Sequence, residues 1–134
     1  MGDLDGLAIR YASASPDQEK LQAEVTEILE KEWAAAKAAD VQTWNRYSDE
    51  FHLVFYRYCN NSRLAESAER LRSGISIFSN QYCRETVIQT RIDEEHLAIF
   101  QAYKDGGIEK AVQMMKTHLN DSLNYALRFL PKTF

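Results

Sequence analysis

Residues 86–130 read TVIQTRIDEEHLAIFQAYKDGGIEKAVQMMKTHLNDSLNYALRFL, and this stretch decides the fold. Apolar residues recur in it every three or four positions on both sides of a central Asp-Gly-Gly. That period is typical of amphipathic α-helices, and the paired glycines favour a reversal of the chain. The segment therefore predicts two antiparallel helices, over 86–104 and 108–130, joined by a turn at Asp105, Gly106 and Gly107.

The same segment carries two of the three histidines of the chain. His96 stands about ten residues before the turn and His118 about eleven after it, so both imidazoles lie on the order of 15 Å from the reversal. Antiparallel packing would bring them level. The third, His52, lies on an earlier helical stretch, with Asp49 three residues before it. We expect the three imidazoles to meet inside the bundle, as in metal sites built between facing helices; the alternative is three unrelated histidines.

The rest of the chain is also helical by its apolar spacing and its capping residues. Asp3 is expected to cap the first helix, Ser15 with Pro16 to open the second, and Asp40 to cap the third, which ends at Asn60. The expected helices cover residues 4–11, 16–38, 41–59, 63–82, 86–104 and 108–130, the last closed by Pro131. We therefore expect an all-α, antiparallel bundle of about six helices, forming one domain over residues 1–134.

Composition and charge narrow the class of protein. The chain has 134 residues, only two prolines and a net charge of −4, which argues against a broad phosphate-binding face, so the chain alone is not expected to bind DNA. It contains no apolar run as long as a membrane span and no signal peptide, and its two cysteines lie outside any C-x-x-C motif. We expect a soluble, cytoplasmic protein. Four arginines interspersed with glutamates predict a solvated, ion-paired face: Arg57, Arg63, Arg70 and Arg72.

Several short pieces, in this order and spacing, resemble one known family. They are Phe51-His52, the turn Asn61-Ser62-Arg63-Leu64, Glu95-His96 followed by Ile99 and Ala102, and Ala111 through Met115 to His118-Leu119. Together they look like the FCD domain, the all-helical effector-binding half of FadR-type regulators in the GntR transcription-factor family. The similarity runs from about Leu4 to Leu127.

The resemblance implies a divalent metal bound by three histidines and one aspartate, with an organic acid completing the coordination. His52, His96 and His118 match the imidazole positions, and zinc or nickel would suit them. The family's aspartate position is Ser48 here, about 40° to one side of His52 on the helix, while Asp49 lies about 60° to the other. Three alternatives stay open: metal with Asp49 in an altered geometry, metal with three imidazoles and water, or no metal and an anion held by the histidines.

For the effector, three further residues are candidates. Arg91 would grip a carboxylate bidentately, Tyr56 would supply a hydroxyl one turn after His52, and Ser48 lies at the site itself. The expected function is therefore an effector-sensing domain that binds a small carboxylate-containing molecule and is not an enzyme. The alternatives are a small three-histidine metalloenzyme, with Asp49 or Glu95 as base, and a helical interaction module without metal.

Regulators of this family join the helical domain to an N-terminal winged helix-turn-helix and form homodimers. That DNA-binding module is absent from this sequence, so contact with DNA is expected only through it. Met1-Gly2 directly before the first helix is typical of an engineered or truncated start, and a natural stand-alone domain is the other interpretation.

Overall fold

The structure, a computed structural model, describes residues 2–128, apart from the side chains of 77–82 and 126. Within this range the chain forms six α-helices and no strand, which confirms the all-α prediction. The helices are α1 (Gly2–Ser13), α2 (Gln18–Lys37), α3 (Val41–Arg57), α4 (Ser62–Tyr82), α5 (Thr86–Lys104) and α6 (Ile108–Leu127). The predicted helix end at Leu130 and the closing Pro131 lie outside the described residues.

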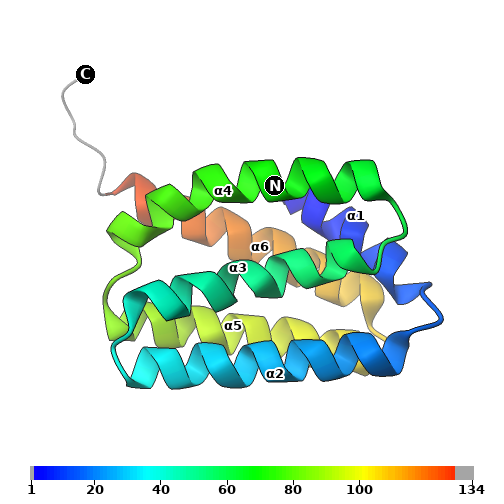
Figure 1. The fold of residues 1–134 in the computed structure, drawn as a ribbon, viewed down its shortest axis with the longest axis horizontal. Coiled ribbons are helices and arrows are strands. Elements are labelled where there is room, and N and C mark those ends of the chain that lie inside the picture. The colour runs from blue at the N-terminus through cyan, green and yellow to red at the C-terminus, as the bar shows by residue number, and fades with distance from the viewer. Residues whose placement is uncertain (1, 129–134) are drawn as a thin grey trace.

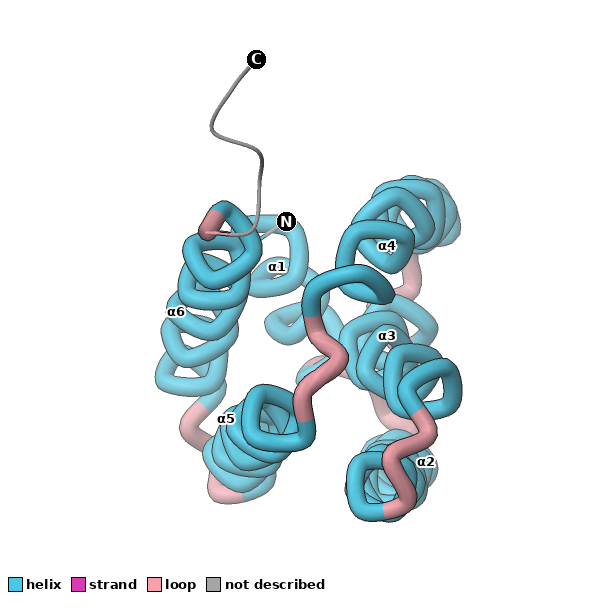
Figure 2. Tube along the Cα trace, turned by 90° about the vertical axis from the view of Figure 1, so that its left-hand side faces the viewer, coloured by secondary structure: helices cyan, strands magenta, loops and turns pink. Residues whose placement is uncertain are grey.

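The helices pack around α3, which contacts α1, α2, α4 and, more sparsely, α5. α5 and α6 run antiparallel on one side of the molecule, and α2 lies against both α3 and α5 (Figure 1). Seen along the bundle, α4 and α6 stand on opposite sides, and they touch each other only sparsely (Figure 2). The region between α3, α4 and α6 is where the site described below lies.

The short helix α1 closes the bundle against α6. A Cβ atom at Gly6 would lie 2.9 Å from Cγ1 of the fully buried Val112, so the missing side chain lets the two helices approach closely. At the outer edge, the Arg10 guanidinium donates two hydrogen bonds, of 2.8 and 2.9 Å, to the carboxylate of Glu109. This packing turns Asp5, on the inner face of α1, into the interior.

Two of the predicted helix starts are wrong, for local reasons. α1 already begins at Gly2, so Asp3 lies in its first turn and is not the N-cap. α2 begins at Gln18 and not at Pro16, because Ser15 forms a turn in which its hydroxyl oxygen accepts from the backbone N–H of Asp17 at 3.2 Å. The Gln18 amide then donates to the carbonyl oxygens of residues 12 and 15, which holds the turn.

The other residues predicted to begin or end a helix do so nearly as predicted. The Asp40 carboxylate caps α3 by accepting from the backbone N–H of Thr43 at 3.2 Å. α3 ends at Arg57, two residues before the predicted end, and Asn60 adopts a left-handed φ of 57°. Between α5 and α6, Gly106 has a φ of 82°, as a sharp reversal requires. This reversal fixes how His96 and His118 face each other.

Candidate metal centre and adjoining cavity

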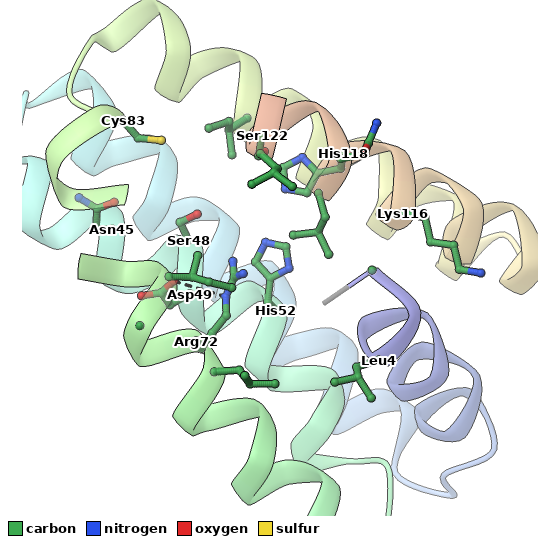
Figure 3. A pocket seen from close by; sticks show the side chains of 18 of the residues that line it. Leu4, Asn45, Ser48, Asp49, His52, Arg72, Cys83, Lys116, His118 and Ser122 are labelled. Atoms are coloured by element: carbon green, nitrogen blue, oxygen red, sulfur yellow. Dashed lines mark ion pairs between the residues drawn. The ribbon is translucent and has the colours of Figure 1, made fainter. Parts of the chain in front are cut away.

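The three histidines meet in the interior, as predicted from their spacing. α3 supplies His52, α5 supplies His96 and α6 supplies His118, and all three side chains are buried. One ring nitrogen of each lies within 4.8 Å of those of the other two, and the Nε2 atoms of His96 and His118 are 3.0 Å apart. Figure 3 shows the rings of His52 and His118 pointing into the same space. Three imidazoles from separate helices therefore converge on one point.

Each imidazole is held from behind by a carboxylate. His52 Nδ1 lies 3.0 Å from an oxygen of Asp5, and His96 Nδ1 lies 2.9 Å from an oxygen of Glu32. His118 Nδ1 lies 3.4 Å from Glu95, a longer and partly exposed contact. A carboxylate at Nδ1 favours the proton on that nitrogen, which leaves the Nε2 lone pair free to bind a metal. Imidazoles that bind zinc in proteins are oriented in this way.

Burial keeps these imidazoles neutral. Loss of solvation lowers the pKa of His96 to about 3 and that of His118 to about 4, and it holds the pKa of His52 well below its ordinary value. The positive charge of Arg72 acts in the same direction on all three. With Nδ1–H donated to carboxylates, the Nε2 atoms of His96 and His118 present two lone pairs to each other across 3.0 Å. Such a donor set is suited to a cation between the rings.

A pair of buried carboxyl groups lies behind His96. Burial raises the pKa of both Glu32 and Asp93 to about 8, and oxygens of the two carboxyl groups lie within 4.8 Å of each other. The indole Nε1 of Trp44 donates to Asp93 at 2.8 Å, and the hydroxyl of Ser48 bonds to Glu32. Two carboxyl groups in such a contact share a proton at neutral pH, because their like charges repel in a medium of low dielectric constant.

We expect the metal-free chain to lose stability as the pH rises from 7.5 to 8.5. In this range the histidines are almost entirely neutral both folded and unfolded, because their ordinary pKa is about 6.5, whereas Glu32 and Asp93 keep a proton only when folded, since their pKa rises from 4.5 and 3.8 to about 8. The unfolded chain then binds fewer protons, so the free energy of unfolding falls, by up to about 1.4 kcal/mol per pH unit and retained proton. Urea unfolding in EDTA at the two pH values measures this.

Asp93→Asn is the matched control for the pH dependence. The asparagine keeps an oxygen for Trp44 and gives Glu32 an amide donor, so Glu32 ionises and the fall in stability should flatten. A parent chain whose urea midpoint does not move between pH 7.5 and 8.5 would contradict the shared proton.

The other predicted site residues are dispersed around this centre. Ser48 lines a large cavity that adjoins the imidazole cluster. The Asp49 carboxylate accepts a hydrogen bond from the Ser76 hydroxyl and lies 3.5 Å from Nε of Arg72. Asp49 is outside the groups of possible metal ligands found among the described side chains. Tyr56 does not line this cavity but donates from its hydroxyl to Asp5 at 2.5 Å, behind His52.

Arg91 lies apart from the three histidines. Its side chain is exposed and lines a second, much smaller hollow of about 30 Å³ beside α6.

Arg72 was expected on a solvated face, and this prediction is wrong. The side chain is buried, and Nε and Nη1 have no hydrogen-bond acceptor among the described residues. It extends from α4 toward His52, next to Asp49 (Figure 3). Because a buried guanidinium with open N–H groups is costly, it is typically the binding point of an anion.

Arg72, His52 and His118 line a cavity of about 970 Å³. Its polar lining also includes Ser48 and Asp49, and six large aliphatic side chains contribute apolar surface. These are Leu4, Leu71, Ile75, Ile92, Leu119 and Leu123. The cavity is within the size range of small-molecule sites and borders the imidazole cluster directly.

One sequence pattern could have indicated the buried charged residues of the site that were not predicted. Glu32 stands four residues after Ile28 and seven after Val25, within the apolar stripe of α2. Asp5 and Arg72 likewise occupy buried helix positions. A charged residue in apolar register indicates a buried partner.

Comparison with known proteins identifies the family. The model of the FCD domain matches residues 2–121 of the chain. Searches of the curated proteins and of the solved structures found no match. Among the described residues, no helix has the length and apolar character needed to cross a bilayer. Since the family model covers most of the 134 residues, the chain belongs to the FCD domain family, the regulatory effector-binding domains of GntR-type regulators.

Proposed function

We propose that this domain senses an organic acid through a divalent metal ion held by His52, His96 and His118. The observation that carries the proposal is the convergence of three buried, neutral imidazoles, each with a carboxylate at Nδ1. Zinc or nickel suits three borderline-soft nitrogen ligands. Three protein ligands leave a coordination position open, as a site that binds a ligand on the metal requires.

The fourth position is the departure from the family pattern. Ser48 stands where the family has an aspartate, and its hydroxyl bonds to Glu32. Asp49 would have to leave Ser76 and Arg72 to reach the ion. We therefore favour three imidazoles with water or the effector in the open position over direct ligation by Asp49.

The effector's carboxylate would bind Arg72. The guanidinium of Arg72 has two buried nitrogens without acceptors and lines the same cavity as His52 and His118. A carboxylate bound there would accept paired hydrogen bonds and reach the ion as well. Of the residues proposed from sequence, Ser48 lines the cavity and would contact the effector. Tyr56 would contribute indirectly, by its hydrogen bond to Asp5 behind His52. Arg91 would contact only a ligand bound in the smaller hollow.

Sensing is favoured over catalysis because the nearby carboxylates already have partners. Asp5, Glu32 and Glu95 each face an imidazole Nδ1, and Asp49 accepts from Ser76. A hydrolytic metal site needs a general base free to take a proton from the bound water. Asp5, Glu32 and Glu95 orient histidines instead.

In the complete regulator, effector binding would change DNA binding by a winged-helix domain. We propose a cytoplasmic homodimer in which the occupied site favours one packing of the helices over another. Such coupling requires that the effector bind one arrangement more tightly than the other.

Metal titration of the purified chain tests the proposal. After removal of metal with EDTA, calorimetric titration should show one zinc ion per chain, and zinc at 100 times its Kd should stabilise the fold by about 2.7 kcal/mol, a shift of several degrees in Tm. At least one of acetate, citrate and octanoate, added to the zinc-loaded chain, should raise Tm further without being consumed. A chain that binds no zinc, or that converts the acid, would contradict a metal-dependent sensor.

A further inference from the structure

The charges around the cavity leave room for one anionic group. Besides the histidines, its charged lining consists of Asp3, Asp49, Arg72 and Lys116. Lys116 Nζ lies 3.4 Å from Asp3, which offsets its charge, and Asp49 stands beside Arg72. A second carboxylate on the ligand would find two acidic side chains and no unpaired cation among the described lining residues. One carboxylate can bind between Arg72 and the divalent ion, whereas a second carboxylate at the far end of the ligand, away from the ion, would meet no unpaired cation among the described lining residues.

The large aliphatic side chains of the lining are poorly covered. Leu71 on α4 and Leu123 on α6 are 49% and 55% exposed, although both face the cavity together with Ile75 and Leu119. Apolar side chains gathered around a cavity in this way lose water favourably only when a ligand covers them with apolar surface. A short hydroxy acid bound at Arg72 would leave these leucines in water.

The size of the cavity leads to the same conclusion. At roughly 30 Å³ for each water molecule, about 970 Å³ holds the equivalent of roughly 30 waters. An acid of two or three carbons would fill a small part of that space.

We propose that the effector is a monocarboxylate with an extended apolar body, bound with its carboxylate at Arg72 and the metal and its body along Leu71, Leu119 and Leu123. This rests on the proposed function of the site and adds the chemical class of the ligand. Acids with a second carboxylate at the far end of the body are disfavoured by charge, and short hydroxy acids are disfavoured by unfilled apolar space.

Four probes separate the two parts of this ligand on the zinc-loaded full chain, measured by calorimetry. Octanoate carries both parts, acetate only the carboxylate, 1-octanol only the body, and octanedioate has a second carboxylate at the far end. At about 0.8 kcal/mol per buried methylene, or about fourfold in Kd, octanoate should bind on the order of 100-fold more tightly than acetate even if burial is incomplete. It should also bind at least about tenfold more tightly than octanedioate or 1-octanol.

A matched pair of variants tests whether the apolar lining is responsible. Leu123 and Leu97 are both 55% exposed, but Leu97 lies on α5 and does not line the cavity. Leu123→Ser should weaken octanoate about tenfold and leave acetate unchanged, whereas Leu97→Ser should change neither. Equal effects of the two variants on octanoate would overturn the proposed position of the body.

The outcomes distinguish this inference from the function on which it rests. If citrate, acetate or octanedioate binds as tightly as octanoate, the proposed ligand class is wrong while the metal-dependent acid site stands. If zinc binds but none of the carboxylates does, the effector function fails and the inference fails with it.

Discussion

A chain with His96→Ala should bind zinc on the order of 1000-fold more weakly than the parent chain. The His96 ring is held on both sides, with Nε2 3.0 Å from that of His118 and Nδ1 2.9 Å from Glu32. Its loss leaves two imidazole ligands and a buried carboxyl group without its donor. Because changes behind a ligand cost about 10- to 100-fold in metal affinity, loss of the ligand itself should cost more. Competition with a chromophoric chelator measures the affinity.

Two variants control for loss of packing and for loss of orientation. Phe51 stacks on His96 with ring centroids 4.2 Å apart, so Phe51→Leu disturbs the same region while leaving every proposed ligand in place. It should lower the free energy of unfolding and leave zinc affinity within a fewfold. Glu32→Leu keeps all three proposed ligands but removes the acceptor at Nδ1 of His96, and it should weaken zinc about 10- to 100-fold. Parent-like affinity in a folded His96→Ala chain would refute the centre.

Arg72→Met should weaken the binding of the best carboxylate among acetate, citrate and octanoate by on the order of 100-fold, with zinc affinity nearly unchanged. Hydrogen bonds to a charged group contribute about 1.5–3 kcal/mol, and methionine keeps only the apolar stem of the arginine. Arg72→Lys should give an intermediate loss, because an ammonium keeps the charge but not the bidentate geometry. Calorimetry on the zinc-loaded variants measures both affinities.

Lys116→Met is the matched control for Arg72→Met. Lys116 lines the same cavity and receives the same substitution, but its ammonium already lies 3.4 Å from Asp3. Its loss should change carboxylate affinity no more than a fewfold. If Lys116→Met abolishes binding while Arg72→Met does not, the carboxylate binds at the other end of the cavity.

The helices and the convergence of the histidines could be predicted because both depend on the spacing of residues along each helix. Apolar spacing places residues on helix faces, and the Asp105-Gly106-Gly107 reversal sets His96 opposite His118. Helix starts were less predictable, since a serine forms an N-cap or a turn with nearly the same local geometry, as Ser15 illustrates.

The partners of the histidines could not be predicted, because they depend on contacts between distant helices. Asp5 is 47 residues from His52, and Glu32 is 64 from His96. Glu95, considered from sequence as the base of a metalloenzyme, lies at His118 and not at its neighbour His96. Arg72 was wrongly predicted on a solvated face for the same reason. Only the packing of α4 on α3 shows that the helix face carrying Arg72 turns inward.

The close seating of α1 on α6 links the first turns of the chain to the chemistry of the centre. Asp5 reaches His52 only while Gly6 allows α1 to lie against Val112. Lifting α1 would free the His52 ring to rotate and weaken its hold on an ion, and by reciprocity a tightly held ion resists that lifting. The packing of α1 on α6 and the binding of an ion at the centre therefore stabilise each other. A change that loosens α1 would lower the affinity of the centre for the ion.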